Sequence, residues 1–502
     1  MKAFLMYKDQ DFDRERKLPP NAQALTQDLE LNTLFNAMAL GDKFVFEVAT
    51  KAVLSSLSDL DTIRYRQHIL QDCLKNASIV RDIYTIAVES IESEKKHYFG
   101  FFRSPNSILY RSLEVLQMFV GMLKKLKQIA DEHADTFESE GFTAFFAMLN
   151  KELGDDYFAS VQHHLRELKF RNGVLMSAEL GKGNQGTNYI LRKPPDQKQG
   201  WIERIFAEKP PIYSFAIADR DESGAQALSG LKDRGINLVA NALAQSTDHI
   251  LSFFTMLRTE LAFYVGCLNV HGQLAQRGEP MSFPLPAASG ERRHSFKGLY
   301  DVCLALTMGQ KVVGNDVNAD SKDLVIITGA NQGGKSTFLR SIGLAQLMMQ
   351  CGMFVPAESF CANVCESLFT HYKRKEDASM KSGKLDEELS RMSDIVDKIT
   401  SHSMVLFNES FAATNEREGS EIARQIICAI LEKRIKVFFV THLYEFAHGF
   451  YDKKMENAMF LRAERQSDGK RTFKVIEGEP LQTSYGEDLY HRIFRTGNEI
   501  HS

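Results

Sequence analysis

The spacing of apolar side chains changes along the chain. From residue 24 to about 165, apolar residues recur at three- and four-residue intervals, which is typical of amphipathic helices. Residues 172–218 instead contain the runs "GVLMSAEL", "TNYILRK" and "IYSFAIAD", separated by glycine, proline and polar clusters, and these runs predict strands. The helical spacing returns from Asp221 to Arg277, over a length unusual for one globular helix, so a lever or strut is expected there.

A third pattern covers the C-terminal part of the chain. After a Pro-, Gly- and Ser-rich joint, "RGEPMSFPLPAASGERR", residues 296–494 alternate strand-like and helix-like segments, as an α/β nucleotide-binding domain does. The expected boundaries are 1–23 for an N-terminal segment, 24–165 for a helical core, 166–220 for a β-containing clamp-like insert, 221–290 for lever helices and a linker, and 291–502 for the α/β domain. The predicted fold class is therefore multidomain, mainly α-helical in the N-terminal part and α/β in the C-terminal part.

A glycine-rich loop, "TGANQGGKST", follows the apolar run Leu324–Thr328 and opens a helical pattern of about 16 residues. It fits the phosphate-loop pattern G-x-x-x-x-G-K-[ST], in which backbone N–H groups surround an anion. The lysine of this pattern reaches the β- and γ-phosphates, and the following hydroxyl ligates Mg²⁺. The predicted nucleotide-binding residues are Gly329, Ala330, Asn331, Gln332, Gly333, Gly334, Lys335, Ser336 and Thr337.

Two later apolar runs also end in polar residues that suit phosphate chemistry. "SMVLFNES" predicts a strand that ends in Asn408-Glu409, and "KVFFVTH" predicts the next strand, ending in His442. A carboxylate beside a phosphate loop can orient a water for attack on the γ-phosphate, so Glu409 is the candidate catalytic group. His442 is the candidate sensor of that phosphate. Asn408, with Ser336, is the candidate magnesium contact, through a bound water.

Composition and charge restrict the class of protein. With 502 residues and 44% hydrophobic residues, the chain can bury several cores, and its net charge of −4 confines any nucleic-acid surface to a local patch. The seven cysteines form no C-x-x-C pair, which predicts reduced core thiols. We find no signal-peptide pattern and no uninterrupted run of the roughly 18 apolar residues that a spanning helix needs, so a cytoplasmic protein without a membrane segment is expected.

The same motifs carry a family resemblance. The segment "TGANQGGKSTFLRSIGLAQLMMQCGMFVPAE", the serine loop "SGKLDEE" that starts at Ser382, the histidine segment "THLYEF" and the C-terminal "SYG" are similar to those of the MutS family of DNA mismatch-repair ATPases. These motifs cover about 200 residues. The stretch "LSDLDTIRYRQHILQDCL" and the long helical pattern at residues 230–275 also resemble the helical core and lever of that family.

The resemblance implies an ABC-type phosphate-loop ATPase that uses ATP and Mg²⁺, forms a homodimer or heterodimer through its ATPase domains, and encloses double-stranded DNA. It implies that Ser382 of one chain faces the phosphates on Lys335 of the other. Family members stack an aromatic side chain on adenine from the segment before the loop, but "VVGND" at residues 312–316 has none. Phe473 falls near the other stacking position of the family, and we expect it to contact the base.

The chain also departs from the family pattern. About 23 residues precede the helical core, so the domain that reads mismatches with a Phe-x-Glu wedge is expected to be missing, and "FAE" at Phe206–Glu208 lies in a proline-flanked stretch. Asn408 stands where the family has an acidic Walker B aspartate. Residues 161–205 hold eight Lys/Arg against four Asp/Glu, with Tyr189 and Trp201, which fits either a DNA-contacting tip or a solvated face.

The expected function is a DNA-binding ATPase, a nucleotide-gated dimeric clamp in mismatch repair or a related repair or recombination process, without direct mismatch reading. The alternative is a nucleotide-gated dimeric scaffold that hydrolyses ATP weakly and binds a protein or ribonucleoprotein. Asn408 favours the alternative, whereas Glu409, Ser382 and His442 favour the enzyme.

Overall fold

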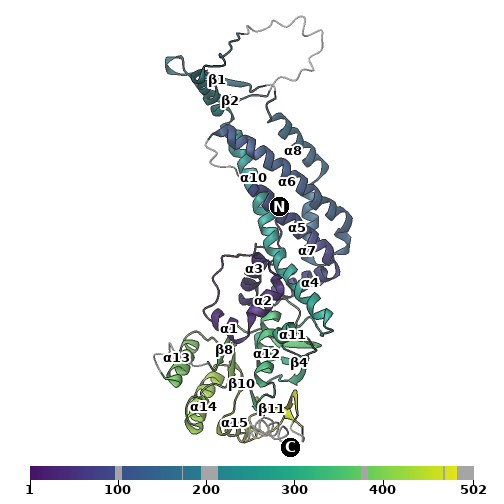
Figure 1. The fold of residues 1–502 in the computed structure, drawn as a ribbon, viewed down its shortest axis with the longest axis vertical. Helices are drawn as coiled ribbons and strands as arrows, with labels where there is room; N and C mark the ends of the chain where they lie inside the picture. The colour runs from purple at the N-terminus through teal and green to yellow at the C-terminus, as the bar shows by residue number, and fades with distance from the viewer. Residues whose placement is uncertain (97–103, 172, 194–212, 375–382, 467–469, 483–502) are drawn as a thin grey trace, which may run out of the picture. The chain divides into compact units, whose positions relative to one another are not determined.

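The computed structural model describes residues 1–96, 104–171, 173–193, 213–374, 383–466 and 470–482. Figure 1 draws the helices and strands of these residues. Their contacts divide the chain into two compact units, each built from separate stretches. The smaller unit comprises residues 1–3, 81–136 and 143–258, and the larger unit comprises residues 4–80, 137–142 and 259–502. Packing therefore groups residues 4–80 with the C-terminal α/β region, whereas the boundaries expected from the sequence follow the order of the chain.

The first part of the chain is helical, as predicted. Its helices are α1 (Ala22–Asp28), α2 (Leu31–Ala39), α3 (Lys43–Leu54), α4 (Leu60–Lys75), α5 (Ala77–Lys96), α6 (Pro105–His133), η1 (Ala134–Thr136), α7 (Glu140–Glu152) and α8 (Asp155–Glu167). Capping explains several starts: the Asp42 carboxylate accepts from Phe44 N and Val45 N at the start of α3. At α6 the Ser104 hydroxyl accepts from Ser107 N, with Pro105 in the first helical turn.

The β-containing insert is a single hairpin. β1 (Met176–Leu180) pairs antiparallel with β2 (Gly186–Leu191), and the short helix η2 (Lys182–Asn184) joins them. This confirms two of the three predicted strands. The third prediction is wrong over its described part, because residues 213–218 form no strand. Their Tyr213 and Phe215 side chains are exposed, and no described strand pairs with this segment to satisfy its backbone groups.

The long helical pattern is confirmed as one helix of 55 residues, α10 (Glu222–Gln276). By length and composition alone this helix could cross a membrane, although it contains no uninterrupted run of 18 apolar residues. However, 72% of its apolar window is buried within the protein, as in a helix that packs into a protein core. No other helix in the described ranges meets the same criteria.

The larger unit contains a six-stranded sheet in the order β12-β11-β6-β10-β9-β8. Its strands are β6 (Leu324–Gly329), β8 (Leu368–Tyr372), β9 (Met404–Asn408), β10 (Lys436–Val440), β11 (Ala458–Arg465) and β12 (Arg471–Glu477). All pairs are parallel except β11–β12. The predicted strand at residues 324–328 is thus confirmed as β6, near the sheet centre with all its residues buried, which explains its continuous apolar sequence.

Helices cover both faces of this sheet. On one face, α13 (Lys384–Val396), α14 (Glu416–Glu432) and α15 (Tyr444–Tyr451) contribute to one apolar core with strands β6, β8, β9 and β10. On the other face, α12 (Lys335–Gln350) packs against β9 and β10. The short helix α11 (Val302–Thr307) contacts α12 and α2. This arrangement of parallel strands between helices leaves the carboxyl ends of the strands open to a ligand.

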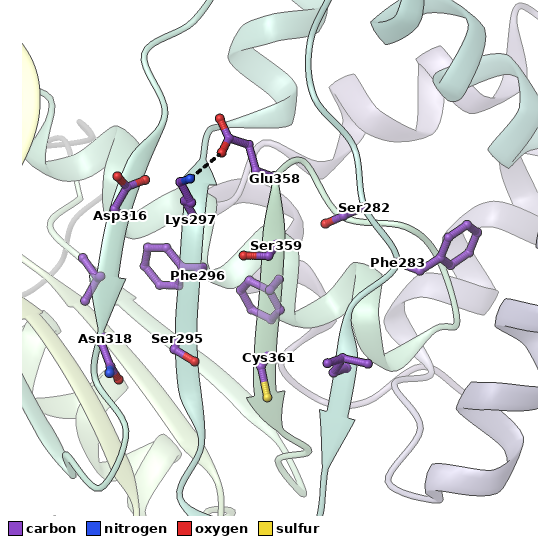
Figure 2. Close-up of a pocket in the computed structure, with 13 residues that line it drawn as sticks. Ser282, Phe283, Ser295, Phe296, Lys297, Asp316, Asn318, Glu358, Ser359 and Cys361 are labelled. Carbon is purple, nitrogen blue, oxygen red and sulfur yellow. Dashed lines mark ion pairs between the residues drawn. The ribbon is translucent and has the colours of Figure 1, made fainter.

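A second sheet in the larger unit has four strands in the order β3-β7-β4-β5. These are β3 (Leu285–Ala287), β7 (Ser359–Asn363), β4 (His294–Leu299) and β5 (Asn315–Asn318), and the short helix η3 (Ser289–Glu291) precedes β4. Phe296 and Phe360 stack on its inner side with ring centroids 6.0 Å apart. Its outer side carries Lys297, which pairs with Glu358 as Figure 2 shows.

Candidate functional site

Three parallel strands of the six-stranded sheet end side by side at the candidate site. Val440, the last residue of β10, pairs with Ile327 of β6 and with Asn408, the last residue of β9. The glycine-rich loop follows β6, Glu409 follows β9, and His442 follows β10 by two residues rather than ending the strand. The alternation of strands and helices therefore brings residues more than 100 positions apart to one edge of the sheet.

The glycine-rich loop has the backbone conformations that its glycines permit. Gly329 and Gly334 have φ angles of 103° and 87°, in the left-handed region. A Cβ at Gly329 would lie 2.9 Å from the backbone nitrogen of Ala463 on β11, so a larger residue would clash there. Gly334 is the N-cap of α12, which begins at Lys335, so the positive end of the helix dipole faces the loop.

The Lys335 side chain lies within this loop. Its Nζ donates to the carbonyl oxygens of Gly329 and Ala330, both at 3.0 Å. Burial lowers the pKa of Lys335 to about 8, opposed by Glu409, while Arg471 acts in the same direction as burial. A buried ammonium held only by carbonyl oxygens lacks the full compensation that an anion would supply. The loop is therefore short of negative charge at the position where a polyphosphate would lie.

Ser336 and Asn408 form the candidate magnesium site. The Ser336 hydroxyl donates to Asn408 Oδ1 at 2.9 Å, so both oxygens face the same small space at the start of α12. Hydroxyl and amide oxygens are hard donors of the kind that Mg²⁺ takes, usually with waters and phosphate oxygens. These two residues fit a bound Mg²⁺, although neither supplies a negative charge.

Glu409 and His442 form a pair directly beside the loop. His442 Nε2 lies 3.1 Å from Glu409 Oε1, and both side chains are about one-third exposed. The hydrogen bond from His442 is the main cause that lowers the pKa of Glu409, so this carboxylate stays ionised near neutral pH. An ionised, partly exposed carboxylate near a phosphate site can accept a hydrogen bond from a water.

A cavity of about 370 Å³ adjoins the loop. Its walls include Gly334, Thr337, Val313 and Phe473, and a Cβ added at Gly334 would lie 3.5 Å from the Phe473 ring. Phe473 is about half exposed, and its carbonyl oxygen accepts from the Asn315 amide at 3.4 Å. The structure thus places Phe473 where a base attached to phosphates in the loop would lie. Val313 also lines this cavity, as part of the segment that lacks an aromatic residue.

The sequence did not indicate the rest of this cavity wall. Tyr300, which precedes α11, lines it with a buried hydroxyl that has no hydrogen-bond partner among the described atoms. Such a group requires a partner or a water when a ligand fills the cavity. The sequence signal that could have indicated Tyr300 is its position directly before Asp301, which caps α11.

Several predicted residues are placed elsewhere or not described. Ser382 and the "SYG" segment lie outside the described residues, as do Phe206–Glu208 and Trp201. The Asn331 carbonyl accepts from Arg471 Nε at 3.2 Å, while its side chain is exposed beside the loop. The described chain contains no group of three His, Cys, Asp or Glu residues positioned to hold a metal.

The helix after the serine loop differs from its predicted pattern. The sequence "SGKLDEELSRMSDIVDKI" predicts an amphipathic helix whose apolar face holds Leu385, Leu389, Met392, Ile395 and Ile399. Of these, Leu389 is 38% exposed, whereas Glu388 beside it is fully buried. Glu388 shares the apolar stripe with Met392 and Ile395, at intervals of four and seven residues. Sequence reasoning missed Glu388, although a carboxylate on an apolar stripe was the signal. Glu388 Oε2 accepts a hydrogen bond from Phe411 N at 2.8 Å, which offsets part of the cost of burying this carboxylate.

A larger cavity, of about 620 Å³, lies on the outer side of the four-stranded sheet (Figure 2). Its lining includes Ser295, Lys297, Ser359 and Cys361, and the Lys297–Glu358 ion pair at 3.5 Å crosses one end. No residue of the glycine-rich loop reaches it. The smaller cavity is the candidate nucleotide site because its walls include Gln332, Gly334 and Thr337, at the loop and the start of α12.

Comparison with known proteins finds two family models that match this chain. Residues 58–277 match the MutS2 N-terminal domain, and residues 325–493 match MutS domain V. The second match contains every site residue from Gly329 to Phe473. The first match contains α4 to α8, the hairpin and α10.

Curated relatives carry the same family name. The DNA mismatch repair protein MutS of Parabacteroides distasonis is 32% identical over 310 residues, which are 58% of this chain and 34% of the relative. MutS of Clostridium kluyveri is 28% identical over 376 residues, which are 72% of this chain and 42% of the relative. MutS of Thermotoga maritima is 32% identical over 210 residues, or 41% and 26%. The chain thus spans between a quarter and two-fifths of their length, and it belongs to the MutS family.

Proposed function

We propose that this protein is a DNA-binding ATPase in which the nucleotide state opens and closes a dimeric clamp, in mismatch repair or a related repair or recombination process. The observation that carries the proposal is the convergence of Lys335, the Ser336–Asn408 pair and the Glu409–His442 pair on one loop beside a base-sized cavity. Family membership supports the same class of reaction.

The arrangement suggests how the residues would act. The triphosphate would lie along the loop N–H groups, and the Lys335 ammonium would exchange its bonds to Gly329 and Ala330 for bonds to phosphate oxygens. Bound Mg²⁺ would neutralise phosphate charge, with Ser336 and Asn408 nearest to it. Glu409 would accept a hydrogen bond from the attacking water while His442 holds its carboxylate, so hydrolysis would need no covalent intermediate.

Steady-state ATPase assays with no DNA and with matched, mismatched or branched duplex would test the proposal. We expect ATP hydrolysis that changes when duplex is added, because the clamp and the nucleotide site would be coupled. A protein that binds neither ATP nor DNA would contradict the proposed function. In the proposed dimer, ATP would lie between the two ATPase domains, and Ser382 of the second copy would face the phosphates.

Duplex binding should depend strongly on salt and little on a single mismatch. The first expectation follows from phosphate contacts, which release counterions. The second follows from the same contacts, because phosphate contacts carry no information on base identity. Titrations of matched and G·T duplexes would measure both effects. A preference above about tenfold, or about 1.4 kcal/mol, would show that some element of this chain reads mispairs.

Asn408 supports one rival, a dimeric scaffold that binds nucleotide, hydrolyses it weakly and holds a protein or ribonucleoprotein. The amide keeps an oxygen near Ser336 but removes the charge that an aspartate would place beside Mg²⁺. Slow ATP hydrolysis that DNA does not change, together with dimerisation that depends on nucleotide, would favour this rival.

The same feature gives a direct prediction for Asn408→Asp. We expect this variant to turn ATP over faster and to need less Mg²⁺, because the carboxylate adds charge where only an amide oxygen faces Ser336. Nucleotide affinity should change little, since Lys335 and the loop are unaltered. ATPase rates across a Mg²⁺ titration would show the effect. An equal or slower rate at every Mg²⁺ concentration would mean that the site is built around the amide.

A further inference from the structure

Helix α13 is joined to the segment that carries Glu409 by a buried hydrogen bond. Glu388 of α13 is fully buried, and its Oε2 accepts from the backbone nitrogen of Phe411 at 2.8 Å. A buried carboxylate is costly unless it receives hydrogen bonds. This bond offsets part of that cost, while the buried Oε1 has no hydrogen-bond partner among the described atoms. Phe411 lies two residues after Glu409, so Glu388 acts on the turn that presents the candidate catalytic group.

That turn has an unusual backbone. Glu409 and Phe411 have φ angles of 55° and 62°, in the left-handed region that residues other than glycine rarely adopt. Each such residue costs on the order of 1–3 kcal/mol and persists only where its surroundings hold it. On one side of the turn, Glu409 N donates to Val440 O at 2.9 Å. On the other side, the bond from Phe411 N to Glu388 is the matching restraint.

A buried histidine ties the same elements together from β8. His371 Nε2 lies 2.9 Å from the Glu388 carbonyl oxygen, and Nδ1 lies 2.7 Å from the Ser410 hydroxyl. A carbonyl oxygen only accepts, so Nε2 carries the proton of this contact. Burial lowers the pKa of His371 to about 4, which keeps the ring neutral near pH 7. The Ser410 hydroxyl donates to the His371 carbonyl oxygen at 2.6 Å and also contacts Nδ1. His371 also stacks on Phe411, with ring centroids 5.3 Å apart.

The geometry points to Glu388 as a positioning residue for the proposed ATPase reaction. By holding Phe411 N–H, it fixes the turn and thereby aims the Glu409 carboxylate at His442 and the water site. This role rests on the proposed function. Because Glu388 belongs to α13, the direction of the Glu409 side chain depends on where α13 lies, and a movement of this helix would alter turnover without touching the glycine-rich loop.

The test compares Glu388→Ala, Glu388→Gln and the control Asp394→Ala in the full-length protein. The Ala variant loses the acceptor for Phe411 N–H, so we expect kcat to fall about tenfold or more, as for a displaced catalytic group, with KM for ATP nearly unchanged. The Gln variant keeps a side-chain oxygen at this position and should retain most of kcat. Asp394 is an exposed carboxylate on the same helix, and its removal should leave kcat unchanged.

Stability and active-site concentration need separate measurement, because Glu388→Ala also creates a small cavity. Thermal unfolding and titration with a non-hydrolysable ATP analogue would give the folded, nucleotide-binding fraction. An unchanged kcat per binding site in Glu388→Ala would overturn the role of Glu388, as would an equal loss in Ala and Gln variants. If the unaltered protein shows no turnover, the proposed function fails and this role fails with it, which is a distinguishable result.

Discussion

Replacing Glu409 with glutamine should leave ATP binding nearly unchanged and reduce steady-state turnover by a factor on the order of 10² or more, the range of general acid–base contributions. The amide keeps the size of the side chain and one oxygen near His442, so the turn and the loop should remain intact. It loses the negative charge that the hydrogen bond from His442 stabilises, and with it the ability to accept a proton from water. Single-turnover and steady-state ATPase rates would measure the loss.

This variant should also trap the ATP-bound state. Because ATP would bind between two ATPase domains, sedimentation with ATP should show a dimer that persists longer than in the unaltered protein. The matched control is Glu432→Gln, which replaces an exposed carboxylate at the end of α14 with an amide. Turnover within a few-fold of the unaltered rate in Glu409→Gln would remove Glu409 from the mechanism, and a monomer in ATP would argue against the shared site.

Lys335→Ala should abolish tight ATP binding. Hydrogen bonds to a charged group contribute about 1.5–3 kcal/mol, so the loss of this ammonium should weaken binding by roughly 10- to 100-fold. The variant also removes the two hydrogen bonds from Lys335 Nζ to the loop carbonyl oxygens, so circular dichroism and thermal unfolding should confirm that it is folded. Calorimetric titration with a non-hydrolysable ATP analogue would give the affinity, with the exposed Lys398→Ala as control. Unchanged affinity would mean that the loop does not hold the phosphates.

The same lysine gives the expected pH dependence of binding. Burial lowers its pKa to about 8, so the group is mostly protonated below pH 8 and mostly neutral above it. Phosphates would favour the ammonium and raise this pKa. ATP affinity should therefore fall as pH rises through 8, with proton uptake on binding above that pH, and Lys335→Ala should abolish this dependence.

The local features of the site could be predicted from the sequence, because each depends on a short stretch of chain. The apolar run at residues 324–328, the glycines around the turn and the helix after Lys335 follow one another directly, and the structure confirms this order as β6, loop and α12. Parallel strands gather their carboxyl ends at one edge, so the approach of Glu409 and His442 to the loop also followed from the predicted strands.

The features that were missed depend on contacts between distant residues. Leu389 is exposed, and Glu388 is buried with a bond to Phe411, 23 positions away, which periodicity alone does not show. Tyr300 reaches the cavity through the packing of α11 beside α12. The segment at residues 213–218 has the composition of a strand, but strands also require a partner, and composition does not supply one.

The discontinuous make-up of the two units has a consequence for synthesis on the ribosome. Every residue of the smaller unit precedes residue 259, whereas residues 4–80 of the larger unit leave the ribosome long before their partners. Two of these partners are synthesised only later. The Glu260 carboxylate accepts a hydrogen bond from Leu5 N, and the Gln350 side-chain amide donates one to Leu57 O. The apolar faces of α1 to α4 are therefore exposed on the nascent chain while the smaller unit is being synthesised. Chaperones could bind these faces during this period.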